Sequence, residues 1–171
     1  MDKFKLIFLD IDGVLNHEIF YDERSQDERA LTLPYPLSDI DPKKVSIINH
    51  IIEATGASVV ISSTWRKSRT VEELQSLFEQ AGFTGKIIGK TPSIYLDRYK
   101  VSVPRGLEIE EYLQQCFEYD HHKRVTYCIF DDDSDMLLHQ KENYFWIDGY
   151  YGLTETIAEK AINLLNKMEG E

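Results

Sequence analysis

The stretch that decides the fold runs from Lys5 to Leu15 and reads KLIFLDIDGVL. Its first half is typical of a buried β-strand, and it ends in two aspartates, Asp10 and Asp12, followed by Gly13. Side chains two residues apart on a strand point the same way, so we expect both carboxylates to face one small volume. Two close negative charges repel unless a cation lies there or one takes a proton. Hard oxygen ligands of this kind favour Mg²⁺.

The length and composition of the chain limit the classes of protein to which it can belong. The chain of 171 residues is 42% hydrophobic, which suits one domain over residues 1–171 with a core of its own. No apolar run approaches the roughly 18 residues that a membrane-spanning helix needs, and the start does not read as a signal peptide. We interpret the two cysteines, Cys116 and Cys128, as buried reduced thiols among apolar neighbours. These features predict a cytoplasmic protein with no membrane partner.

The charge of the chain is negative but uneven. A formal net charge of −11 argues against broad, nonspecific nucleic-acid binding. Residues 66–105 nevertheless hold eight basic and four acidic residues, so this segment carries +4. A basic middle in an acidic protein indicates a local anion site, the alternative being an ordinary mixed surface.

Strand-like and helix-like segments alternate along the chain. The expected strands are residues 4–9, 57–61, 86–88, 125–130 and 144–147. The expected helices are residues 42–55, 70–81, 106–117, a short one after 135 and a last one from 154. This order predicts an α/β fold of three layers, Rossmann-like, with a central parallel sheet and helices on both faces. Residues 14–40 lack a regular pattern and read as an irregular loop or flap, and residues 89–104 read as a loop.

Reactive side chains follow three of the expected strands. Asp10 and Asp12 follow the first, Ser62 and Ser63 the second, and the acidic run 131–135 the fourth. Ligands of parallel α/β sheets bind beyond the carboxyl ends of the strands, near a switch in strand order. We therefore expect these groups to meet at one edge of the sheet. A basic residue, Lys100 or Arg105, stands at the start of the following helix.

In this order the segments resemble the four motifs of the haloacid dehalogenase (HAD) phosphohydrolase superfamily, over the whole chain. A closer resemblance is to the small HAD domain of "Swiss army knife" RNA-repair proteins. It is carried by SSTWR at 62–66, RGLEI at 105–109, FDDDSDM at 130–136 and GLT at 152–154. In this superfamily a cap domain often selects the substrate. Residues 14–40 and 89–104 are too short for a large cap, so we expect a minimal cap or none.

The resemblance implies a role for each group. Asp10 is the expected nucleophile, which forms an aspartyl-phosphate. Asp12 is the expected general acid that protonates the leaving oxygen and then activates water, the alternative being an acid that only orients the metal. Ser62 is expected to bind phosphate oxygens, with Ser63 as the alternative if the strand runs one residue longer. Arg105 balances charge at the phosphate, and Lys100 is its rival; either is otherwise a surface charge.

The expected cofactor is Mg²⁺, held by Asp10, by Asp12 through its backbone carbonyl, and by an acid of the run 131–135. Asp132 matches the metal ligand best, with Asp131 beside it. Asp135 stands four residues after Asp131, as in a spaced variant of the motif, so the register stays open.

Further side chains lie outside the expected catalytic and metal-binding groups. We expect Trp65 and Arg66 to stack on and pair with the substrate, a core aromatic being the alternative for Trp65. Phe20-Tyr21 and Tyr95-Leu96 are loop residues that could close over a small substrate. The histidines at 17, 121 and 122 read as surface or loop residues.

The favoured function is a Mg²⁺-dependent phosphatase acting on a phosphomonoester. A small molecule, a nucleotide or a nucleic-acid end would suit an open site. One alternative is a HAD-like protein that binds phosphate or a partner without catalysis. The other is a receiver-type signalling domain, which would carry its phosphorylated aspartate on a middle strand.

Overall fold

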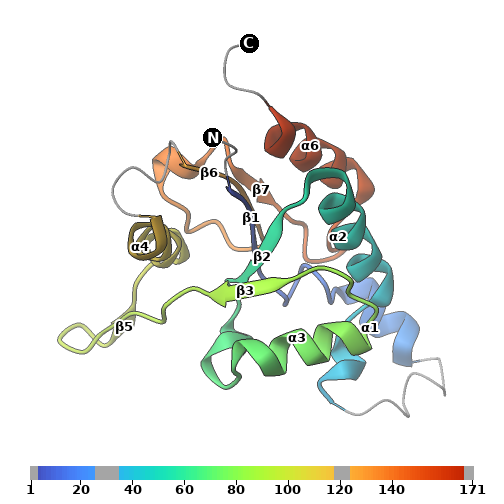
Figure 1. Cartoon of the computed structure of the whole chain (residues 1–171). Helices are drawn as coiled ribbons and strands as arrows, with labels where there is room; N and C mark the ends of the chain where they lie inside the picture. The colour runs from blue at the N-terminus through green and yellow to red at the C-terminus, as the bar shows by residue number, and fades with distance from the viewer. Residues whose placement is uncertain (1–3, 26–34, 118–123, 168–171) are drawn as a thin grey trace.

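The computed structural model describes residues 4–25, 35–117 and 124–167 (Figure 1). Five parallel strands form its central sheet, in the order β3-β2-β1-β6-β7. Their bounds are β1 (Phe4–Leu9), β2 (Ser58–Ile61), β3 (Ile87–Lys90), β6 (Val125–Asp131) and β7 (Tyr144–Trp146). The predicted parallel α/β fold is confirmed. The order is that of a Rossmann-like sheet, whereas a receiver-type, flavodoxin-like sheet places its second strand at the edge and its third beside the first.

Strand β1 lies in the middle of the sheet and is buried on both faces. Ile7 and Leu9 pack into the core on one face, and Leu6 and Phe8 pack into the core on the other. A strand covered on both faces reads as a continuous apolar run, which is why the segment before Asp10 carries no polar alternation.

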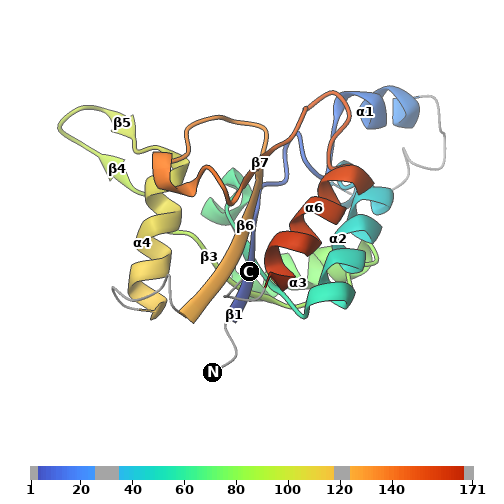
Figure 2. The same cartoon turned by 90° about the horizontal axis from the view of Figure 1, so that it is seen from above.

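Helices cover the two faces unequally (Figures 1 and 2). One face is covered by α2 (Pro42–Thr55), α3 (Val71–Gln80) and α6 (Glu155–Asn166), and the other by α4 (Arg105–Phe117). Helix α2 begins at Asp41, whose side chain accepts the backbone N–H of Lys43. Helix α3 begins with the predicted capping box of Thr70 and Glu73. The three predicted layers are therefore present.

Two stretches that read as irregular contain regular structure. Helix α1 (Glu18–Ser25) and the 3₁₀ helix η2 (Leu37–Asp39) lie within residues 14–40, and the antiparallel strands β4 (Tyr95–Leu96) and β5 (Val101–Ser102) form a hairpin within 89–104. Helix α1 carries little apolar periodicity, and Arg24 ties it to the backbone of Ser38 and the side chain of Asp39. Such polar ties between separated segments leave no periodic sequence signal.

One prediction of burial is wrong. Cys128 is buried in β6, but Cys116 is exposed, because α4 turns Ile109 and Leu113 to the core and leaves position 116 outside. His17 lies in a loop, as predicted, but it is buried there, and its Nε2 lies 3.1 Å from Asp41 Oδ2. The histidines at 121 and 122 lie outside the described residues. Within the described ranges, no helix is both long and apolar enough to cross a membrane.

Candidate active site

The reactive side chains meet at the carboxyl edge of the sheet. From β1 the chain builds β2 and β3 on one side, and it later crosses to build β6 and β7 on the other. The switch point therefore lies between β1 and β6, where the Asp10 N–H donates to the Phe130 carbonyl oxygen at 3.0 Å. Asp10 directly follows β1 and Asp131 ends β6, so the two stand side by side where such sheets bind ligands.

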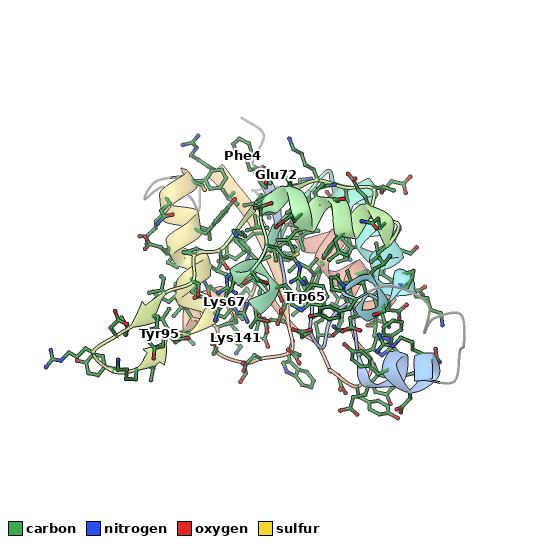
Figure 3. All side chains as sticks on the ribbon, turned by 90° about the horizontal axis from the view of Figure 1, so that it is seen from below. Phe4, Trp65, Lys67, Glu72, Tyr95 and Lys141 are labelled. Carbon is green, nitrogen blue, oxygen red and sulfur yellow. The ribbon has the colours of Figure 1, made fainter. Side chains whose placement is uncertain are left out.

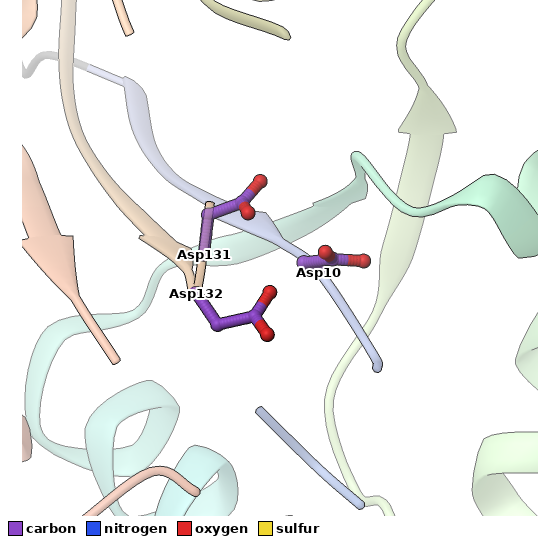
Figure 4. A group of neighbouring side chains, drawn as sticks. All are labelled: Asp10, Asp131 and Asp132. Carbon is purple, nitrogen blue, oxygen red and sulfur yellow. The ribbon is translucent and has the colours of Figure 1, made fainter. Parts of the chain in front are cut away.

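Three carboxylates form a compact cluster at this point (Figure 4). Asp10, Asp131 and Asp132 each offer an oxygen, and these oxygens all lie within 4.8 Å of one another. Asp131 is fully buried, Asp10 is 6% exposed, and Asp132 faces solvent. Neither Asp12 nor Asp135 belongs to this cluster. Among the candidate acids, the geometry therefore favours Asp131 and Asp132 as the partners of Asp10.

The cluster is electrostatically strained without a cation. Burial raises the pKa of Asp10 to about 6, although Arg105, the Ile11 N–H and the Ser63 hydroxyl each lower it. Burial, followed by the negative charge of Asp10, raises the pKa of Asp131 to about 8. Burial also raises the pKa of Asp132. A site that holds three carboxylates together in this way favours protons or a metal ion over three free anions.

The donor set fits a hard divalent cation. All three groups offer carboxylate oxygens, the ligand type that Mg²⁺ prefers. One of them, Asp131 Oδ2, is buried and accepts no hydrogen bond in the described structure. Gly13 keeps the approach open: its φ is +73°, and a Cβ there would lie 2.2 Å from Asp132 Oδ2. Asp10, Asp131 and Asp132 are therefore the residues that could hold the ion.

Arg105 is the basic side chain that faces the cluster. Its Nη2 lies 3.9 Å from Asp10 Oδ2, and its Nε lies 3.7 Å from Asp131 Oδ2. Asp135 holds the start of α4 in place, since its Oδ2 accepts the Arg105 backbone N–H at 2.7 Å. Lys100 instead lies exposed between β4 and β5. The structure thus brings Arg105, and not Lys100, to the predicted site, and it makes Asp135 a support for that arginine.

Asp12 takes a different position from the one predicted. Its carboxylate accepts the Trp65 indole N–H at 3.1 and 3.2 Å and the Asn16 amide N–H at 3.0 Å. Strand β1 ends at Leu9, so the rule that alternate side chains share a face does not extend to Asp10 and Asp12. The two carboxylates remain electrostatic neighbours. Asp12 therefore stands next to the cluster, held by anchors that spacing in the sequence could not identify.

Trp65 and Arg66 do not form the substrate-contacting pair that the sequence suggested. Trp65 is 7% exposed, lies in the core and uses its N–H to hold Asp12. Arg66 is 4% exposed, pairs with Glu108, and donates to the backbone oxygens of Ser63 and Thr91. The alternative for Trp65, a core aromatic, is confirmed. The prediction for Arg66 is wrong because its donors are used inside the protein. In this structure the motif at 62–66 therefore supplies side chains that hold other residues of the site in place.

The two serines after β2 are both fully buried. The Ser62 N–H donates to the Leu9 carbonyl oxygen at 2.9 Å, which continues the β1–β2 ladder, and its hydroxyl has no hydrogen-bond partner in the described structure. The Ser63 hydroxyl instead accepts the Trp65 backbone N–H at 3.4 Å, and it lies close enough to the Asp10 carboxylate to lower the pKa of Asp10. The geometry therefore places the alternative, Ser63, nearest the predicted nucleophile.

The comparison with known protein families agrees with this arrangement. Residues 6–158 match the model of the family described as "HAD domain in Swiss Army Knife RNA repair proteins". The match spans most of the chain and all the site residues named above, so the chain belongs to this family of HAD domains. Neither the curated proteins nor the solved structures compared with the chain gave a match.

Proposed function

We propose that this HAD domain is a Mg²⁺-dependent phosphatase that removes a phosphate from a phosphomonoester through an aspartyl-phosphate on Asp10. The observation that carries the proposal is the buried cluster of Asp10, Asp131 and Asp132 with Arg105 beside two of its members. A purely structural site would be expected to pair these charges fully, because unpaired buried carboxylates are costly. Family membership supports hydrolysis of phosphate esters as the class of reaction.

In this mechanism Asp10 attacks phosphorus and the bond to the leaving oxygen breaks. The Ile11 N–H, at 2.7 Å from Asp10 Oδ1, and the Ser63 hydroxyl fix the orientation of the attacking carboxylate. Arg105 balances the charge of the phosphoryl oxygens as they approach two acids. When bound, Mg²⁺ neutralises negative charge between the carboxylates and the phosphate.

Asp12 acts as the general acid and then as the general base. It gives a proton to the leaving oxygen, and the resulting carboxylate takes a proton from the water that attacks the aspartyl-phosphate. Water attack returns Asp10 to its starting form and releases inorganic phosphate. Trp65 and Asn16 keep the Asp12 side chain beside Asp10 without placing it in the metal-binding cluster.

The insertions at this edge leave room for large substrates. Among the described residues they are limited to α1, η2 and the β4–β5 hairpin, and Figure 2 shows α1 and the hairpin on opposite sides of the molecule. Nucleic-acid ends and nucleotides are therefore the substrates that we would test first.

The experiment is a phosphate-release screen with Asp10→Asn as the blank. It includes an aryl phosphate, nucleotides, sugar phosphates and oligonucleotides phosphorylated at the 3′ or the 5′ end. We expect release with Mg²⁺, none with EDTA and none from Asp10→Asn. Phosphate or partner binding without release from any substrate would favour the non-catalytic alternative.

A further inference from the structure

A cavity of about 370 Å³ opens beside Asp12. Its lining comes from the turn after β1, from the segment before α2, and from η3 (Thr64–Lys67) with the residues that follow it: Asp12, Tyr35, Asp39, Thr64, Trp65, Ser68 and Arg69. Ligand pockets typically measure about 300–1,000 Å³, so a small organic group fits. A general acid must lie within hydrogen-bond reach of the oxygen that it protonates. The cavity at Asp12 is therefore where the leaving group of the proposed reaction has room.

Arg69 supplies this cavity with a cation that has no acidic partner among the described residues. Its guanidinium carbon lies 4.9 Å from the centre of the Trp65 ring, and its Nη1 lies 3.4 Å from Ser68 Oγ. No carboxylate of the described residues pairs with it. By contrast, the other guanidinium groups near this edge, those of Arg24, Arg66 and Arg105, all face carboxylates.

The position of Arg69 suits the binding of an anion. Stacking on Trp65 fixes the plane of the guanidinium and leaves N–H donors at its edge. An arginine held in this way binds phosphate oxygens through two parallel hydrogen bonds. Because the same Trp65 also holds Asp12, the cation and the general acid sit at a fixed separation on one aromatic ring.

The two acids in the cavity do not cancel this cation. Asp39 is engaged by Arg24. Asp12 is held by the N–H groups of Trp65 and Asn16 and forms no ion pair with Arg69 in the described structure. The remaining polar groups of the lining, the hydroxyls of Thr64, Ser68 and Tyr35, are compatible with a phosphate or a sugar.

We infer that Arg69 binds a second anionic group, a phosphate or a phosphodiester, carried by the leaving group of the substrate. The inference rests on the proposed function, because the role of Asp12 locates the leaving group. It makes Arg69 a specificity-determining residue. Substrates in which one nucleoside carries two phosphates, or a phosphate next to a phosphodiester, would be preferred over simple monophosphates.

The test compares kcat/KM for thymidine 3′,5′-bisphosphate with kcat/KM for the 3′- and 5′-monophosphates. A hydrogen-bonded charge pair corresponds to about a 10- to 100-fold preference for the bisphosphate. In Arg69→Gln we expect this preference to fall to within about twofold, and in Arg69→Lys to survive in part. The ratio of these kcat/KM values cancels any effect of the substitution on Asp12, since hydrolysis of all three substrates depends on that acid.

Lys67→Gln is the matched control. It removes the same charge from an exposed neighbour on η3 that does not line the cavity, whereas Trp65 on the same helix does. Figure 3 labels both side chains. We expect it to keep the full preference. Hydrolysis of all three substrates without a preference, or a preference unchanged in Arg69→Gln, would overturn the inference alone. No hydrolysis of any of them would overturn the inference and the proposed function together.

Discussion

Two arginines at the carboxyl edge of the sheet, the buried Arg66 and the half-buried Arg105, are used in opposite ways. Arg66 forms an ion pair with buried Glu108 and donates to three backbone carbonyl oxygens. Arg105 approaches Asp10 and Asp131 only to 3.9 and 3.7 Å, and its buried Nη1 has no hydrogen-bond partner in the described structure. The two guanidinium groups differ in how far their donors are satisfied.

This difference distinguishes an arginine that supports the structure from one that is proposed to take part in the reaction. A buried polar group is almost always hydrogen-bonded, and an exception calls for an explanation such as a missing ligand. The region of Arg66 is complete in the protein alone. In the proposed reaction, a phosphate and a metal ion would supply the acceptors and the charge that the Arg105 region lacks.

Disrupting the Arg66 region, where the hydrogen bonds are satisfied, should have the largest effect on the free energy of unfolding. Arg66→Met leaves the Glu108 carboxylate buried without its cationic partner, which typically costs about 3–5 kcal/mol. Urea unfolding followed by circular dichroism measures this loss. The double variant Arg66→Met/Glu108→Leu is the control, and it should recover much of the stability. An Arg66→Met protein as stable as the parent would contradict the role assigned to this pair.

Disrupting the Arg105 region, where a buried donor lacks a partner in the described structure, should lower kcat instead. Arg105→Met removes a charge that stabilises the transition state, and we expect kcat on an aryl phosphate to fall about 10²- to 10³-fold. Lys100→Met is the matched control, because that side chain is exposed on the hairpin. Its kcat should stay within about twofold of the parent. If Lys100→Met lost activity while Arg105→Met stayed active, Lys100 and not Arg105 would be the cation of the site.

The strained acids should make the metal-free protein less stable as the pH rises. The pKa of Asp131 is raised to about 8 and that of Asp10 to about 6, from an ordinary value of 3.8. Between about pH 4 and pH 8 the folded state therefore binds more protons than the unfolded state, and its free energy of unfolding falls. Asp131→Asn should remove much of this fall and raise the Tm at pH 8, by about 2–4 °C for each kcal/mol regained.

Thermal unfolding in EDTA at pH 5.5 and pH 8 measures that effect. Mg²⁺ should raise the Tm of the parent more at pH 8 than at pH 5.5, because its ligands must be deprotonated. It should raise the Tm of Asp131→Asn much less. Equal Tm values at both pH values for the metal-free parent would contradict the strain described for the cluster.

The smallest effect concerns the anchor of Asp12. Trp65→Phe keeps an aromatic ring in the core but removes the N–H that holds the Asp12 carboxylate. One hydrogen bond contributes about 0.5–1.5 kcal/mol, so we expect kcat to fall about two- to tenfold. Steady-state kinetics on the aryl phosphate measures this change. A kcat equal to that of the parent would mean that the indole does not position the acid.

The sequence predicts those parts of the molecule that follow a local rule. The apolar run before Asp10, the helix caps at Asp41 and Thr70, and the order of strands and helices all report short-range physics, and the structure has them. The acids of the cluster also follow, because the carboxyl ends of parallel strands meet at one edge.

What the sequence did not reveal depends on contacts between distant segments. Arg66 and Glu108 are far apart in the chain, so nothing in their spacing showed that the arginine would turn inward. The same holds for Trp65 and Asp12. From the sequence alone, a polar residue that follows a strand gives no sign of whether it faces the substrate or supports another residue that does.

The most direct measurement of the central claim is the trapping of phosphate on the protein. The enzyme is mixed with a ³²P-labelled phosphomonoester that it turns over, quenched in acid during turnover, and digested. We predict a hydroxylamine-sensitive label on the peptide that contains Asp10, which is absent with EDTA and absent from Asp10→Asn. Sustained phosphate release from a verified Asp10→Asn protein, with no label on that peptide in the parent, would contradict the account.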